Sequence, residues 1–423
     1  MFGVLLAVVL GVVLYAIVSR WTTGLEGKRA LLALTGGYVL RLILQTFLRD
    51  IPFFSHGVGG DNETYEHWAR AIVLIWEHSG FEYITQEQFW QLGQTSLPSN
   101  LFALVYWANG GPTRVGCTAL VAFAACLTCF NLYKLALEFG AEEGMAVRVL
   151  VLLLFGPAFL MYTSEMYKDG LVAFFVVGAL GSAFRLSRKF SLLHVAIGVI
   201  SLLALWQVRY YLGFVTVGRL LVGLSGLTSR SSDRPVMASL LFVAVGLFLT
   251  SYTSMLDSAT DSIGATFDIG TSREAIDEKA AGGSGVLFDD GGSPFGALHL
   301  KTAYMLLAPF PWQTGTIGLQ IGKIDALVWY YLLYHAIVAG RRLFREDRQL
   351  LLMFLVFLVP TSLMYAVGMS NVGLAVRQRI PIVLFGGMLA AMSLRRKAIA
   401  SEEGVAEADQ EAAEPGLATG ERA

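Results

Sequence analysis

The chain has 423 residues, of which 55% are hydrophobic and only 15% are charged. Its mean hydropathy of +0.60 is too high for a soluble globular protein of this length. The formal net charge of −1 excludes attraction to nucleic acid through bulk electrostatics, so an anionic ligand would have to be held by a local cluster of cations. The sequence therefore predicts an integral membrane protein.

A helix that crosses a bilayer needs about 20 mostly apolar residues, and eleven stretches approach that length. They lie near residues 2–18, 30–48, 115–136, 146–163, 170–184, 191–206, 210–226, 236–256, 325–340, 350–368 and 381–394. The first stretch lacks the basic residues that precede the apolar core of a signal peptide, so we interpret it as a retained membrane helix. These spans predict an all-α polytopic transmembrane domain over residues 1–394.

Lysine and arginine collect in five places between or after the spans. These are Arg20, Lys28 and Arg29; Arg185, Arg188 and Lys189; Arg230 and Arg234; Arg341, Arg342, Arg345 and Arg348; and Arg395, Arg396 and Lys397. Eleven spans put all five clusters on one face, and short loops rich in these residues stay in the cytoplasm. We therefore expect the N-terminus outside and the C-terminus inside.

The opposite, external face receives two long connections, residues 49–114 and 257–324, which are rich in acidic residues, glycine and aromatic residues. The second connection contains "DSATDSIGATFDIGTSREAIDEKAAGGSGVLFDDGGSP", which is typical of a flexible, partly helical loop. Residues 395–423 include an acidic, alanine-rich stretch and are predicted to be a disordered cytoplasmic tail.

The first external loop contains "GGDNETYEHWARAI" (59–72), an acidic and aromatic stretch between apolar segments. Its pattern puts Asp61, Tyr65, Trp68 and Ile72 on one face of a helix. A carboxylate at the tip of such a face, lying along the membrane surface, is well placed to meet an amphipathic substrate. The plainer alternative is that Asp61 is the helix N-cap and accepts a hydrogen bond from a free backbone N–H.

Two short turns bring further ionisable residues to the same face. Glu165, Lys168 and Asp169 lie in "TSEMYKDGL", and Arg209 lies in "WQVRYYLG". Ionisable groups at membrane depth or in short external turns are costly, so they are candidates for function. The alternative is that the first three are ordinary interfacial polar residues and that Arg209 snorkels within an aromatic belt.

Arg377 and Arg379 lie in "NVGLAVRQRIP" (371–381), where their charge is unusual for an external loop. Pro381 biases Ile380 away from helix, and if the run before it is also extended, residues two apart point the same way. Two guanidiniums on one side would then form a clamp that matches phosphate oxygens.

Two other features lie inside predicted spans. Arg41 is a cation within the second span, where it could satisfy a carboxylate or support the external loop from below. Cys117, Cys126 and Cys129 fall in one apolar run that includes "CLTC". Because no histidine lies nearby, we interpret the cysteines as small apolar side chains and predict neither a metal site nor a disulfide there.

An aspartate that opens a large external loop after an early span, with a tyrosine four residues later, resembles the GT-C superfamily of polytopic membrane glycosyltransferases. The stretches "SEMYKDGL", "LLAPFPWQ" and "NVGLAVRQRIP" are similar to those of bacterial membrane proteins of exopolysaccharide and O-antigen assembly. The resemblance covers the layout of residues 28–394. The first loop departs from the family in having Asp61 and Glu63 rather than a paired Asp-Asp, Asp-x-Asp or Asp-Glu motif, which leaves metal dependence open.

The resemblance implies transfer of a sugar from a polyprenyl-phosphate-linked donor to a glycan, lipid or protein acceptor at the external face of a bacterial plasma membrane. Asp61, with Glu63 beside it, would be the catalytic base on the acceptor hydroxyl. The substrate-binding residues implied are Arg377, Arg379, Arg209 and Lys168 for the departing phosphate, Tyr65 and Trp68 for the lipid or sugar ring, and Glu165 and Asp169 for the acceptor. The resemblance assigns no definite cofactor, and Glu165, Asp169 or Glu63 could bind a divalent cation.

Three other functions are consistent with the same residues, one of them that of a non-catalytic assembly or sensor protein. An O-antigen type polymerase would move a whole glycan from a polyprenyl diphosphate and would also use external arginines. A transporter or flippase of lipid-linked glycans would place charged or broken helices near the middle of the membrane, often with repeat symmetry. The ionisable residues here concentrate at one face, which favours glycosyl transfer.

Overall fold

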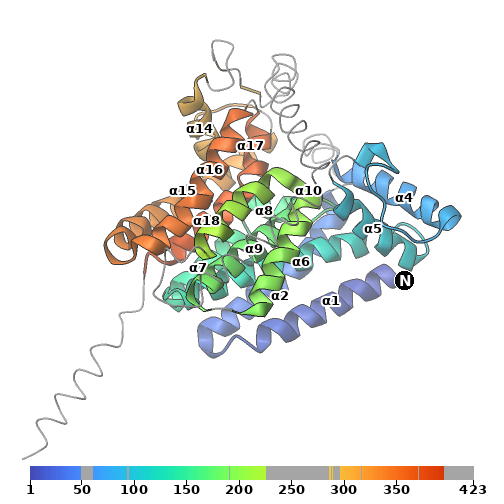
Figure 1. Ribbon diagram of the computed structural model, residues 1–423, viewed down its shortest axis with the longest axis horizontal. Coiled ribbons are helices and arrows are strands. Elements are labelled where there is room, and N and C mark those ends of the chain that lie inside the picture. The colour runs from blue at the N-terminus through green and yellow to red at the C-terminus, as the bar shows by residue number, and fades with distance from the viewer. Residues whose placement is uncertain are drawn as a thin grey trace, which may run out of the picture.

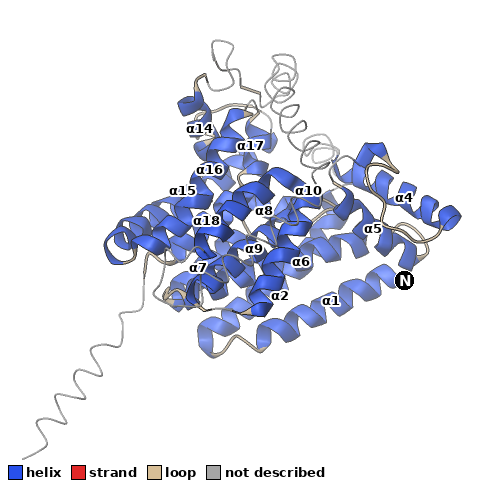
Figure 2. Cartoon of the chain, in the orientation of Figure 1, coloured by secondary structure: helices blue, strands red, loops and turns tan. Residues whose placement is uncertain are grey.

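The computed structural model describes residues 1–48, 61–92, 95–189, 191–224, 285–286, 288, 296–315, 317–369 and 371–394. Within these ranges there are helices and no β-strand, which confirms the prediction of an all-α protein (Figure 2). The helices are α1 (Phe2–Ser19), α2 (Gly24–Leu48), α4 (Asp61–Ser79), η1 (Trp90–Leu92), α5 (Ser96–Asn109), α6 (Arg114–Glu138), α7 (Glu143–Leu154), α8 (Pro157–Tyr162), α9 (Asp169–Arg188), α10 (Leu192–Leu224), α14 (Leu298–Leu307), α15 (Ile317–Glu346), α16 (Arg348–Val367), α17 (Val372–Gln378) and α18 (Ile380–Ala391).

Among the described residues, six helices are long and apolar enough to cross a membrane. They are α1, α2, α6, α9, the first part of α10 and α16, and the bent pair α17–α18 makes a seventh if it is one broken span. The protein is therefore membrane-embedded, but the predicted count of eleven spans is not confirmed. The predicted span 236–256, most of the loop 257–324 and the tail 395–423 lie outside the described residues.

The predicted span 146–163 is divided into α7 and α8. The division falls at Pro157, whose ring disfavours helix at Gly156 before it and which supplies no backbone N–H. Pro157 itself starts α8, a position where the missing N–H costs nothing. A short helix therefore carries the chain from the end of α7 to the turn that leads into α9.

One end of the bundle, here called the basic end, contains the turn between α1 and α2, the end of α6 and the end of α9 (Figure 1). The Lys134 ammonium lies 3.4 Å from the centroid of the Trp21 ring. Arg185 donates two hydrogen bonds, of 2.8 and 2.9 Å, to the two carboxylate oxygens of Glu138. Two of the predicted basic clusters flank these contacts, so the structure places them at one end.

The opposite end, here called the Asp61 end, contains the paired helices α4 and α5, beside the start of α1 (Figure 1). The inward face of α4 carries Tyr65, Ile72 and Trp76, which are buried in a core shared with Phe102 of α5. The backbone N–H of residue 3 donates a 3.0 Å hydrogen bond to Asn109, which ties α1 to the end of α5. The predicted helical face of α4 is therefore confirmed, and it packs inward.

The main core lies between α6, α7, α9, α15 and α18, where small residues let the helices approach closely. A Cβ atom at Gly387 would lie 2.8 Å from the Leu153 side chain, and one at Gly386 would lie 2.7 Å from the Trp329 ring. The three cysteines are free and buried, as small apolar side chains would be. This packing brings α17, which precedes α18, next to the ends of α8 and α9.

Candidate functional site

The centre of the candidate site is Arg377, in the last turn of α17. Asn371 starts this helix by accepting a 3.1 Å hydrogen bond from the backbone N–H of Leu374. The guanidinium contacts two carboxylates from distant parts of the chain: Nη1 lies 2.6 Å from Oδ2 of Asp61, and Nε donates a 2.7 Å hydrogen bond to Oδ2 of Asp169. Arg377 thus joins the first residues of α4 and α9, where the helix dipole favours negative charge.

A second arginine reaches the same buried carboxylate. Nη2 of Arg209 lies 3.4 Å from Oδ1 of Asp169, and both side chains are buried. Arg209 can do this because α10 is kinked at this residue, whose backbone angles of −163° and 77° are not helical. Asp169 therefore balances two arginines inside the protein.

Lys168 and two tyrosines complete the surroundings of Arg377. Cζ of Arg377 lies 5.1 Å from the ring centroid of Tyr162 and 5.2 Å from that of Tyr167, which are distances typical of cation–π contacts. Lys168 directly precedes α9 and is partly buried. Burial, and next the charge of Arg209, lowers the pKa of Lys168 to about 8. Three cations thus share one site with two aspartates, and such a site can attract an anion.

The low pKa of Lys168 predicts a specific dependence of stability on pH. Its ammonium should lose a proton near pH 8 in the folded protein, against 10.5 for an unperturbed lysine. Between these values the unfolded chain binds a proton that the folded protein does not, so this group makes folding more favourable as the pH rises. Lys168→Met should reduce that rise in the thermal unfolding midpoint between about pH 8 and 10, while the exposed-lysine control Lys28→Met should retain it. Equal pH profiles for both variants would contradict the assignment.

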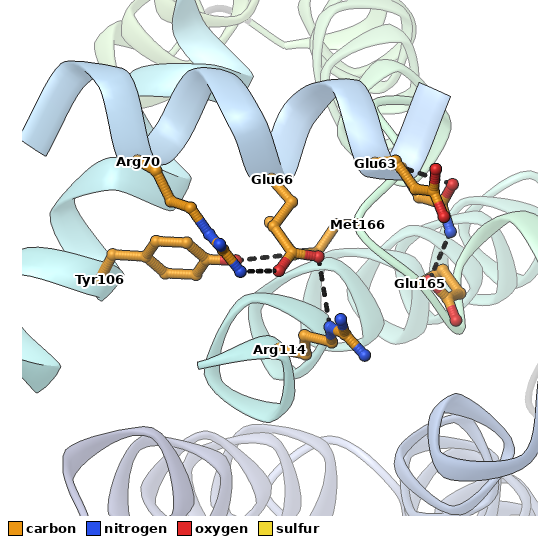
Figure 3. A network of polar contacts seen from close by, with 8 residues as sticks. Glu63, Glu66, Arg70, Tyr106, Arg114, Glu165 and Met166 are labelled. Carbon is orange, nitrogen blue, oxygen red and sulfur yellow. Dashed lines mark hydrogen bonds and ion pairs between the residues drawn. The ribbon is translucent and has the colours of Figure 1, made fainter. Parts of the chain in front are cut away.

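Figure 3 shows the polar network that fixes α4 to its neighbours. Glu66 is buried and forms ion pairs with Arg70 of the same helix and with Arg114 of α6, the latter at 3.2 Å. Near the start of α4, Nδ2 of Asn62 donates a 2.9 Å hydrogen bond to Oε2 of Glu165. These contacts hold the first turn of α4, and with it Asp61, against the turn that carries Lys168 and Asp169.

The predicted clamp of Arg377 with Arg379 is wrong, because residues 372–378 are helical and not extended. Arg379 is also in the right-handed helical region, so its side chain points away from that of Arg377. Nη1 of Arg379 donates to the carbonyl oxygens of Leu306 and Ala308 at 3.0 and 2.8 Å, and Nη2 lies 3.4 Å from Asp325. Arg379 is fully buried and links segments of the bundle to one another.

Arg41 also has a structural role. Its Nε donates a 2.7 Å hydrogen bond to Oγ1 of Thr163, and its Nη2 donates a 2.8 Å hydrogen bond to the carbonyl oxygen of Leu154. The latter oxygen belongs to the last residue of α7, whose carbonyl lacks a partner further along that helix. Arg41 therefore supports the break between α7 and α8 and the turn into α9. Of the two roles considered from the sequence, this is closer to support of an external segment than to pairing with a carboxylate.

The remaining predicted site residues are placed differently. Tyr65 is buried with its ring edge against Trp68 and Phe102, which anchors α4, and it lies close enough to Asp61, Asp169 and Arg377 to interact with their charges. Glu63 is exposed in the first turn of α4. The described residues contain no group of three or more histidine, cysteine, aspartate or glutamate residues that could hold a metal ion.

Sequence reasoning did not identify the two tyrosines beside Arg377 or the ion pair of Glu66 with Arg114. The tyrosines had a visible signal, since Tyr162 and Tyr167 lie on either side of Glu165 and Tyr167 directly precedes Lys168 in the turn between α8 and α9. The pair of Glu66 with Arg114 had none, because the two residues belong to separate helices.

No known protein family matches the chain, and no curated protein or solved structure is significantly similar to it.

Proposed function

We propose that the protein is a membrane glycosyltransferase of the GT-C type, which moves a sugar from a polyprenyl-phosphate-linked donor to a glycan, lipid or protein acceptor. The observation that carries the proposal is the position of Asp61, a carboxylate that is 46% exposed and lies 2.6 Å from an arginine that is itself held by a buried aspartate. A base beside a preorganised cation is what acyl, phosphoryl and glycosyl transfers have in common.

The location of the site supports a lipid-linked donor. Asp61, Asp169 and Arg377 lie at the end of the bundle opposite the basic end, close to where several apolar helices begin or end. A donor whose chain lies in the bilayer presents its phosphate at that depth. The basic end corresponds to the cytoplasm under the positive-inside tendency, so the site faces the exterior of a bacterial plasma membrane in this proposal.

The proposed reaction is a direct displacement. The carboxylate of Asp61 takes the proton of the acceptor hydroxyl, and the acceptor oxygen forms a bond to the anomeric carbon of the sugar. The bond from that carbon to the phosphate oxygen breaks, and its electron pair stays with the phosphate. The lipid phosphate leaves with one more negative charge, which Arg377, Arg209 and Lys168 stabilise.

Asp61→Asn tests the proposal most directly. Asparagine keeps the size of the side chain and can still accept a hydrogen bond from Arg377, but it cannot take a proton. We expect turnover of a polyprenyl-phosphate sugar by the protein in lipid nanodiscs to fall by about 10²–10⁴-fold. The control Glu77→Gln neutralises an exposed carboxylate in the last turn of the same helix.

Undiminished turnover by Asp61→Asn would remove Asp61 from catalysis. Running the same assay with polyprenyl-diphosphate glycans separates transfer of a single sugar from the polymerase alternative, because only the polymerase would prefer the diphosphate. If the donor moves across the bilayer and no new glycosidic bond forms, the protein is a transporter and not a glycosyltransferase.

A further inference from the structure

The two carboxylates that hold Arg377 differ in exposure. The side chain of Asp169 is 3% exposed, whereas that of Asp61 is 46% exposed, and Arg377 between them is 10% exposed. Asp169 contacts Nε and Nη2 of the guanidinium, and Asp61 contacts Nη1. One carboxylate is therefore a buried and fixed partner of Arg377, and the other is a partner at the surface that a dissolved or lipid-borne anion can reach.

The pair of Asp61 with Arg377 has one exposed partner, so water and salt screen it more than they screen the fully buried pair with Asp169. A phosphate can replace Asp61 on Nη1 without disturbing the contacts of Arg377 with Asp169. Replacement of Asp169 would instead leave two buried arginines without their counter-charge, which is far more costly. The exchangeable position in this site is thus the one that Asp61 occupies.

We propose that Asp61 occupies the phosphate position of the resting site, and that binding of the donor phosphate to Arg377 displaces Asp61 and so releases the catalytic base. This inference rests on the proposed function for the identity of the anion. It adds the order of events: the donor binds first, and only then is the carboxylate free to take a proton from the acceptor.

The charges around the site agree with this exchange. With Asp61 displaced, Arg377, Arg209 and Lys168 face the single carboxylate of Asp169, which leaves an excess of two positive charges. A sugar-linked lipid phosphate carries one negative charge and becomes a phosphate monoester with close to two when the sugar leaves. The site is thus better matched to the departing phosphate than to the donor, as transition-state stabilisation requires.

The exchange predicts that removal of the charge of Asp61 strengthens phosphate binding. Full-length protein in phosphatidylcholine nanodiscs would be titrated with farnesyl phosphate, with farnesol as the neutral control ligand. Asp61→Asn should bind farnesyl phosphate about fivefold more tightly than the unsubstituted protein, because the phosphate no longer competes with a carboxylate. Arg377→Gln should lose the preference for the phosphate over farnesol, and Glu77→Gln should bind as the unsubstituted protein does.

Two outcomes would overturn the exchange, and they are distinguishable. If farnesyl phosphate binds in preference to farnesol but Asp61→Asn binds it equally or more weakly, Asp61 does not compete with phosphate, and the proposed glycosyl transfer still stands. If neither the unsubstituted protein nor Asp61→Asn binds farnesyl phosphate more tightly than farnesol, the site does not bind phosphate. The exchange then fails together with the proposed function. The thermal unfolding midpoint of each variant shows whether it is folded in the assay.

Discussion

Asp169→Asn is expected to have one of the largest effects of any single substitution in this protein. Asp169 is buried and balances the charges of Arg377 and Arg209. Asparagine can accept hydrogen bonds but carries no charge, so two buried guanidiniums would lose their shared counter-ion. We expect a loss of stability of about 3–5 kcal/mol, measured by the unfolding of the purified protein in lipid nanodiscs.

Asp347→Asn provides a matched control, because Asp347 is also a carboxylate at the start of a membrane helix. It accepts a 3.0 Å hydrogen bond from the backbone N–H of Leu350 and so caps α16. Asparagine is an equally good N-cap, so this variant should cost well under about 1 kcal/mol. If both variants lose the same small amount, Asp169 is an ordinary residue of a helix start and does not hold the site together.

The second large effect is expected at the buried pair of Arg379 with Asp325. Asp325 also accepts a 3.1 Å hydrogen bond from the backbone N–H of Ala158, at the start of α8. The pair therefore joins α8, α15, the loop after α14 and the junction of α17 with α18. Either Arg379→Met or Asp325→Leu should cost about 3–5 kcal/mol, because each leaves one buried charge without its partner.

A double-mutant cycle distinguishes a structural from a ligand-binding role for Arg379. The double variant Arg379→Met/Asp325→Leu should be more stable than the sum of the two single losses predicts, because no unpaired charge then remains. Its affinity for farnesyl phosphate should be close to that of the unsubstituted protein. If the double variant is stable but no longer binds farnesyl phosphate, Arg379 takes part in phosphate binding, as the sequence-based prediction of a clamp with Arg377 proposed.

Much of the fold follows from local patterns in the sequence. The apolar stretches predicted near residues 2–18, 30–48, 115–136, 170–184 and 350–368 correspond to α1, α2, α6, α9 and α16. The face of α4 was also predictable, because a helix repeats every 3.6 residues and the buried side chains recur with that period. These features depend on neighbouring residues alone.

The choice of partners within the site could not be predicted in the same way. Arg377 and Arg379 are two residues apart and equally charged, and the pattern before Pro381 favoured an extended chain in which both point the same way. Pro381 instead lies in the first turn of α18, where its missing N–H needs no partner. The backbone is therefore helical across this junction, and the two guanidiniums lie roughly 200° apart around the axis.

The sequence by itself determined that the chain is embedded in a membrane, and it grouped Asp61, Asp169, Arg209 and Arg377 as candidates for one site. It could do so because an ionisable residue in the hydrocarbon core of a bilayer has a high free energy, so most such residues lie in the turns between apolar spans. Only the tertiary structure decided which carboxylate holds which arginine, that Arg379 and Arg41 support the bundle, and that Asp61 is the accessible one of the two carboxylates on Arg377. Those outcomes depend on burial and on the distance to a counter-charge, which are set by helices that are remote in sequence and adjacent in space.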